Sequence, residues 1–156
     1  HIVYRYNINV CFIPHIFSDL KSINFILDGL EDSLIRNHII IAPCIQGDYG
    51  ANYNFSIYKN SEIVIGTRFH ANVCGVSMAV DTIGLSILKR VESMYNNIGI
   101  KDSFIRAENF FSHSVCKKID RIIDNKGNSR VLHDFNFLKN ESLKLHKESI
   151  NSLLNI

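Results

Sequence analysis

Two side chains that could carry chemistry, Arg68 and His70, follow a short β-branched run that stops at Gly66. A guanidinium group recognises a carboxylate or a phosphate at two points, and an imidazole can hold or deliver a proton near neutral pH. Together they could bind an anion and move a proton on it. The alternative for this pair is structural: an arginine that caps neighbouring carbonyl groups and a histidine that is buried with one hydrogen bond.

The residues around this pair predict the strand, turn and helix that would position it. A β-rich run covers residues 62–65, Gly66 and Thr67 follow it, and an almost wholly apolar helical pattern begins at Phe69. In an open α/β sheet such a junction lies at the carboxyl end of a strand, where ligands usually bind and where free helix amides favour an anion. Asn72 lies inside the apolar helix and needs a partner, so we expect it to make a structural hydrogen bond.

Three more groups would meet this corner if the sheet is parallel. His15 follows Pro14 at the end of the first buried strand, and Lys89 and Arg90 follow the fourth short strand. Because the carboxyl ends of parallel strands share one edge, these side chains could face the same ligand. The alternative for the two basic residues is a solvated helix start. Asp19 could orient a histidine or only complement the dipole of its helix.

Strands and helices alternate along the chain, which predicts a doubly wound, mostly parallel Rossmann-like sheet in a single α/β domain over residues 1–156. Strands are expected over residues 1–6, 9–13, 38–42, 62–65 and 81–85. Helices are expected over residues 18–35, 51–59, 69–80, 90–98 (ending at Gly99), 114–124 and 130–154, so residues 112–156 form C-terminal helices. Residues 46–50 indicate a loop, and the stretch after Lys101 indicates an irregular connection.

The composition narrows the classes of partner. Basic and acidic residues are interspersed with a net charge of +2, so no field favours nucleic acid or an anionic membrane as the main partner. The four cysteines lie far apart, without a CxxC pair or a Cys/His cluster, so we expect reduced thiols in a cytoplasmic protein and no metal site. No apolar stretch approaches the roughly 20 residues that a membrane helix needs, and we expect no signal peptide.

Residues 61–73, with the sequence SEIVIGTRFHANV, resemble the C-terminal half of the polysaccharide pyruvyl transferase family. That family has a strand, an R-x-H, a small-residue helix, another strand, and a basic residue before a helix that ends in a Leu-Gly-Leu type turn. Here the later parts are residues 82–85 and residues 90–100, which end in Ile-Gly-Ile. The segment from Ile13 to His15, with Asp19 nearby, is similar to the Pro-His segment of the family. The resemblance covers roughly residues 1–102 and is most specific over residues 61–74.

The resemblance implies a fold like that of the C-terminal half of a GT-B type glycosyltransferase and transfer of a pyruvyl group from phosphoenolpyruvate to a cell-surface saccharide. It implies that Arg68 holds the carboxylate or phosphate of the donor and that His70 is the acid/base, with His15 as a further catalytic candidate. Arg90 stands where the family usually has a lysine. The remaining donor-site candidates are Gly66, Thr67 and Lys89.

The same resemblance sets the expected partners and location. Phosphoenolpyruvate is the donor substrate, no separate cofactor is expected, and the acceptor is a saccharide or a lipid-linked saccharide. The chain would be the donor-binding half of a larger two-domain enzyme, and its N-terminal domain would lie outside the sequence. We expect it in the cytoplasm, including the inner face of a membrane.

Two other classes of function fit the same residues. A glycosyltransferase that uses a sugar nucleotide would bind its diphosphate at the same edge of the sheet. A non-catalytic module that binds an anion or a saccharide would use the same corner without turnover. Thermal stabilisation by nucleotide sugars and not by phosphoenolpyruvate would favour the glycosyltransferase.

Overall fold

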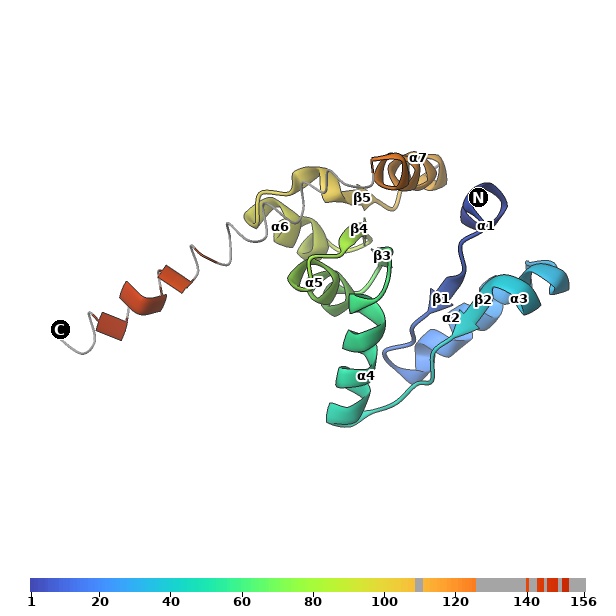
Figure 1. Cartoon of the computed structure of the whole chain (residues 1–156), viewed down its shortest axis with the longest axis horizontal. Coiled ribbons are helices and arrows are strands. Elements are labelled where there is room, and N and C mark those ends of the chain that lie inside the picture. The colour runs from blue at the N-terminus through green and yellow to red at the C-terminus, as the bar shows by residue number, and fades with distance from the viewer. Residues whose placement is uncertain (109–110, 126–139, 141–142, 145, 149, 152–156) are drawn as a thin grey trace. The chain divides into compact units, whose positions relative to one another are not determined.

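A computed structural model describes residues 1–108, 111–125, 140, 143–144, 146–148 and 150–151 (Figure 1). The chain divides into two compact units, residues 1–57 and residues 58–156, and each is described by itself. The sequence predicted one doubly wound sheet, whereas the structure pairs the strands in two small parallel sheets. The parallel α/β class is therefore confirmed. A single domain over residues 1–156 stays a prediction.

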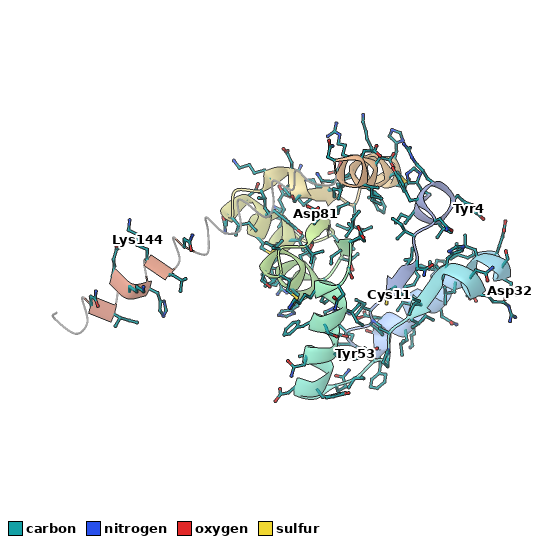
Figure 2. The ribbon with its side chains drawn as sticks, in the orientation of Figure 1. Tyr4, Cys11, Asp32, Tyr53, Asp81 and Lys144 are labelled. Atoms are coloured by element: carbon teal, nitrogen blue, oxygen red, sulfur yellow. The ribbon has the colours of Figure 1, made fainter. Side chains whose placement is uncertain are left out.

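The first unit contains one pair of parallel strands with helices before, between and after them. Its elements are α1 (Ile2–Tyr6), β1 (Val10–Phe12), α2 (Phe17–Leu27), α3 (Asp32–His38), β2 (Ile39–Ile41) and most of α4 (Gly47–Lys59). Val10 lies opposite Ile39 where β1 pairs with β2. Figure 2 marks Cys11 in the middle of β1. The βα order predicted here is confirmed, but the connection from β1 to β2 contains two helices.

Three of the local predictions in the first unit are wrong. Residues 1–6 alternate like a strand but form the single turn of α1, which stops at Asn7 in the left-handed conformation (φ 54°), one that asparagine tolerates. The helix expected over residues 18–35 is interrupted between α2 and α3, and α3 starts afresh with Asp32 bonded to Arg36 one turn later. Most of the loop expected over residues 46–50 belongs to α4, which begins at Gly47 and has Asp48 in its first turn.

The second unit is built on a three-stranded parallel sheet in the order β3-β4-β5. Its elements are β3 (Ile63–Gly66), α5 (Phe69–Ser77), β4 (Asp81–Ser86), α6 (Lys89–Asn97), the 3-10 turn η1 (Lys101–Ser103), β5 (Phe104–Arg106) and α7 (Phe111–Asp124). Gly66 pairs with Gly84, and Ser86 pairs with Arg106. The three strands therefore end at one edge, and two residues separate β3 from α5 and β4 from α6 at that edge (Figure 1).

The core of the second unit lies where α5 and α6 pack on β4. Ile83 of β4 and Tyr95 of α6 are fully buried, and Val76 and Val91 pack in the same interior. The ring of Phe104 stacks on that of Tyr95 with centroids 6.1 Å apart. Burial of one such side chain stabilises the folded state by about 1.5–3 kcal/mol. Tyr95 thus joins α6 to β4 and β5.

Most sequence predictions in the second unit are confirmed within a few residues, including the helix end at Gly99. Gly99 has φ 80°, its N–H donates to the Asn96 carbonyl (3.2 Å), and the Ile100 N–H donates to the Tyr95 carbonyl (3.1 Å). The irregular stretch expected after Lys101 is wrong in one respect, because it contains β5. Three residues are too few to show a strand period. The helix expected over residues 130–154 lies largely outside the described residues.

Candidate functional site

The junction between β3 and α5 presents the predicted Arg68–His70 pair. Gly66 is the buried last residue of β3, whereas Thr67 and Arg68 are exposed in the turn, and His70 is exposed in the first turn of α5. Arg68 is the N-cap residue, and its side chain makes no capping hydrogen bond to the helix. The structural alternative of a buried histidine is therefore wrong for His70. The exposed positions allow both side chains to meet a ligand.

Asn72 fixes the backbone of this turn from below. Its side chain is fully buried, and its Nδ2 donates to the Gly66 carbonyl (3.0 Å) and to the Arg68 carbonyl (2.7 Å). Its Oδ1 accepts a hydrogen bond from the Tyr95 hydroxyl (2.8 Å). The structural role predicted for Asn72 is confirmed. One amide thus joins the end of β3, the start of α5 and the last turn of α6.

Two glycines make room for this arrangement. A Cβ atom on Gly66 would lie 2.8 Å from Asn72 Nδ2, and a Cβ atom on Gly84 would lie 2.3 Å from Tyr95 Cε2. Such contacts are far shorter than van der Waals packing permits, so both positions require glycine unless the neighbours move. Gly66 pairs with Gly84 in the sheet, so the two glycines form one backbone surface on which Asn72 and Tyr95 pack.

The junction between β4 and α6 adds a second cation beside the first pair. The Arg90 guanidinium carbon lies 4.4 Å from the centroid of the Phe69 ring. The Phe69 ring meets the His70 ring edge to face, with centroids 5.8 Å apart. Arg90 and His70 therefore meet at the Phe69 ring, and Arg68 directly precedes Phe69 in the chain. We call Arg68, His70 and Arg90 the arginine edge. The predicted meeting of the two junctions is confirmed for Arg90.

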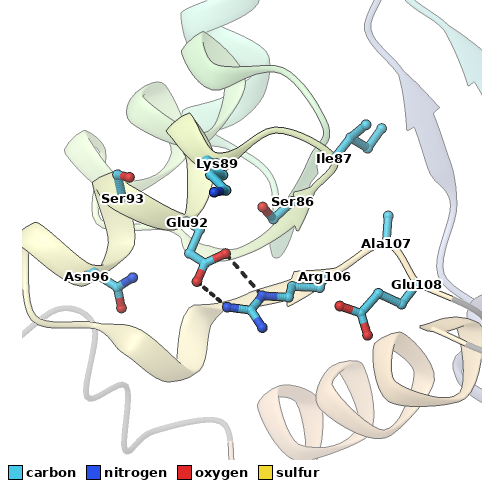
Figure 3. Close-up of a pocket in the computed structure, with 9 residues that line it drawn as sticks. All are labelled: Ser86, Ile87, Lys89, Glu92, Ser93, Asn96, Arg106, Ala107 and Glu108. Atoms are coloured by element: carbon cyan, nitrogen blue, oxygen red, sulfur yellow. Dashed lines mark hydrogen bonds and ion pairs between the residues drawn. The ribbon is translucent and has the colours of Figure 1, made fainter.

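Lys89 lies on another side of α6, where it lines an open hollow of about 670 Å³ between the ends of β4 and β5 and the face of α6 (Figure 3). Its lining is mostly polar: Ser86, Ile87, Lys89, Glu92, Ser93, Asn96, Arg106, Ala107 and Glu108. We call this space the polar hollow. The sequence predicted a basic residue here but not the hollow itself.

An ion pair crosses the polar hollow from α6 to β5. Arg106 donates through Nε to Glu92 Oε2 (3.0 Å) and through Nη2 to Glu92 Oε1, in the planar two-point geometry that arginine favours. This hydrogen bond lowers the pKa of the Glu92 carboxyl and raises the pKa of Arg106. Both groups therefore stay charged through the neutral range. Arg106 is the last residue of a short apolar strand, and Arg68 lies two residues after one. This similarity is the sequence feature from which Arg106 could have been predicted as a site residue.

His15 belongs to the first unit, so its distance from the arginine edge is not defined. Its backbone N–H donates to Asp19 Oδ2 (2.9 Å), and the Ile16 N–H donates to the same oxygen (3.2 Å). Asp19 therefore caps the start of α2 through the backbone, close to the helix-dipole role considered for it. A catalytic role for His15 stays a prediction.

Three sequence predictions about metal, thiols and membrane have these structural counterparts. Within the described ranges, no group of three His, Cys, Asp or Glu side chains could hold a metal ion. Cys11, Cys44, Cys74 and Cys116 are free thiols, and burial raises the pKa of Cys11 and of Cys74. Among the helices that the structure describes, none has the length and apolarity to cross a bilayer.

Sequence reasoning missed the residues that support the site. Phe69 was expected only in the apolar stripe of α5, yet its ring carries Arg90. The hydrogen bond of Tyr95 could not be predicted, because an aromatic residue at helical spacing indicates a core position without indicating where its hydroxyl points.

No protein-family model, no curated protein and no solved structure matches this chain.

Proposed function

We propose that the chain carries the donor site of an enzyme that transfers a pyruvyl group from phosphoenolpyruvate to a saccharide. One observation supports this most: the Arg90 guanidinium is stacked on the Phe69 ring, which also meets the His70 ring, so that a cation and an imidazole from two strand–helix junctions lie together. The proposal also rests on the resemblance of residues 61–74 to the pyruvyl transferase family.

The arginine edge suits the two charged groups of phosphoenolpyruvate. The phosphate, through its ester oxygen, and the carboxylate are both attached to C2 of this small molecule, and each is recognised by a planar guanidinium group at two points. The first-turn amides of α5 add a favourable electrostatic environment for one of the two anions. Arg68 and Arg90 would thus hold the donor, with Gly66 and Thr67 setting the approach of the backbone.

His70 has the chemistry that the first step needs. In that step the imidazolium gives its proton to C3 of phosphoenolpyruvate, so that C2 becomes an oxocarbenium centre. One saccharide hydroxyl then forms a bond to C2 and loses its proton. The C2–O bond to phosphate breaks, and phosphate leaves with the bonding electron pair. A second hydroxyl attacks C2 and closes the ketal, releasing the second proton. A positioned acid typically supplies a factor of about 10²–10⁴ in rate, and the arginines stabilise the departing anion.

The first test replaces His70 with alanine in the protein that carries its complete catalytic domains. Ketal formation and phosphate release should fall about a hundredfold or more, whereas the affinity for phosphoenolpyruvate, measured by calorimetry, should change little. His113→Ala, at an exposed histidine of α7, is the matched control and should leave both unchanged. Pyruvyl transfer at a near-normal rate by the His70 variant would reject the assignment.

The same measurements separate the other classes of function. Stabilisation by UDP-glucose but not by phosphoenolpyruvate would replace the proposal with a glycosyltransferase. Binding of phosphoenolpyruvate without turnover by the complete protein would indicate a binding module.

A further inference from the structure

The polar hollow lies on a different face of α6 from the arginine edge. Lys89, Glu92, Ser93 and Asn96 recur at the spacing of one helix face, and all four line the hollow. Arg90 is one residue further round the helix and stacks on Phe69 instead. One helix therefore separates two regions that both open at the carboxyl edge of the sheet.

The two regions differ in charge. Arg68 and Arg90 contribute two positive charges to the arginine edge. In the hollow, Lys89 and Arg106 are balanced by Glu92 and Glu108, so its lining is formally neutral. The Glu92–Arg106 pair further reduces the attraction for a free anion, because each charge already has an opposite partner. An anionic donor is therefore favoured at the edge and not in the hollow.

The hollow is rich in groups that bind hydroxyls. Carboxylates accept hydrogen bonds, the ammonium and guanidinium groups donate them, and the Ser93 hydroxyl and the Asn96 amide can do both. Arg106 donates to Glu92 through Nε and Nη2, and the guanidinium group has further N–H donors beyond these two. Ile87 is 68% exposed at the same place and offers an apolar contact to the C–H face of a ring. Figure 3 shows these side chains around the shared space.

We propose that the polar hollow binds an uncharged polyhydroxylated ring of the saccharide acceptor, on the face of α6 away from the arginine edge. That the ligand is a saccharide is inferred from the hollow alone. That this saccharide is the acceptor rests on the proposed function. Asn96 and Ser93 select the ligand by hydrogen bonds. The Glu92–Arg106 ion pair joins α6 to β5 across the hollow.

The test is an NMR titration of the whole chain, labelled with ¹⁵N, against the methyl β-glycosides of glucose, galactose and mannose, and separately against phosphoenolpyruvate. At least one glycoside should shift the Asn96 Nδ2 and Arg106 Nε signals, and phosphoenolpyruvate should instead shift Arg68 and Arg90. Asn96→Ala should weaken glycoside binding about fivefold, the worth of one neutral hydrogen bond, and leave phosphoenolpyruvate binding unchanged. Asn97→Ala, at the neighbouring exposed amide outside the described lining, is the control and should change neither.

Three results would overturn the inference. They are the absence of any glycoside shift at Asn96 and Arg106, an equal affinity of the Asn96 variant and the wild type, and a stronger response of the hollow to inorganic phosphate than to the glycosides. Failure of the proposed function gives a different pattern: a glycoside shift at Asn96 with no response of Arg68 or Arg90 to phosphoenolpyruvate.

Discussion

The second unit places a buried polar network directly beneath an exposed one. Asn72 and Tyr95 are fully buried, and each makes hydrogen bonds that cross between elements. Arg68, His70 and Arg90 lie at most five residues away in the chain from a member of that network, yet all three are exposed. A buried polar group is costly without partners and therefore fixes a geometry, whereas an exposed one keeps the freedom to bind a ligand.

This contrast separates the residues that fix the geometry of the site from those that would contact a ligand. The interior network joins the turn after β3 to the last turn of α6, and its two side chains are fully buried. The arginine edge supplies charge and a proton donor on that support. Interior substitutions should therefore lower stability first, and edge substitutions should lower ligand binding or turnover at nearly constant stability.

The largest expected effect belongs to Asn72→Ala. The change leaves the Gly66 and Arg68 carbonyls without the Asn72 donor, leaves the Tyr95 hydroxyl without its acceptor and opens a small void. We expect a loss of about 3 kcal/mol in the free energy of unfolding, measured with urea. Asn97→Ala, at an exposed position of α6, should stay within about 0.5 kcal/mol of the wild type. An Asn72 variant that keeps wild-type stability but loses phosphoenolpyruvate binding would contradict the assignment of Asn72 to structural support.

A smaller effect is expected at Tyr95, and it depends on pH. Tyr95→Phe removes the hydrogen bond to Asn72 Oδ1 and should cost about 1.5 kcal/mol near pH 8. Burial raises the pKa of Tyr95 above its ordinary value of 10.0, so above pH 10 the phenol ionises in the unfolded chain before it ionises in the folded one. The stability supplied by the protonated phenol is therefore complete below pH 10 and is lost as the pH rises towards the folded pKa.

Urea unfolding of wild type and Tyr95→Phe at pH 8 and pH 11 measures this term. The gap between the two proteins should shrink by about 1.4 kcal/mol, because one pH unit above the unfolded pKa is worth that much. Taking the difference cancels the titration of the other groups, including the buried thiols. A gap that is the same at both pH values would show that the Tyr95 hydroxyl ionises as easily in the folded protein as in the unfolded one.

The sequence was most informative where one residue type had one physical meaning. Asn72 in an apolar helix needed a partner, Gly99 ended a helix, and the strand before Arg68 ended where a site was expected. It was least informative where a contact crosses between elements. Neither the stacking of Arg90 on Phe69 nor the pairing of Glu92 with Arg106 has a local pattern, because the partners lie 21 and 14 residues apart in the chain. The polar hollow is formed in part by β5, and a strand of three residues is too short to be predicted from its sequence pattern.

The smallest effect tests whether Phe69 belongs to the edge or to the interior. Phe69→Leu keeps an apolar side chain but removes the ring that Arg90 covers, an interaction worth about 0.5–1 kcal/mol at an exposed site. We expect phosphoenolpyruvate to bind about threefold more weakly by calorimetry, with little change in the free energy of unfolding. Phe111→Leu, on α7, controls for the general effect of this substitution.

A double-mutant cycle with Arg90→Ala makes this prediction specific. If Phe69 acts by holding Arg90, its replacement should have no further effect on donor binding once the guanidinium is gone. Fully additive losses would instead mean that Phe69 contacts the donor or shapes α5 independently. A loss of stability as large as that of Asn72→Ala would show that Phe69 supports the fold together with Asn72 and Tyr95 and does not act mainly on ligand binding.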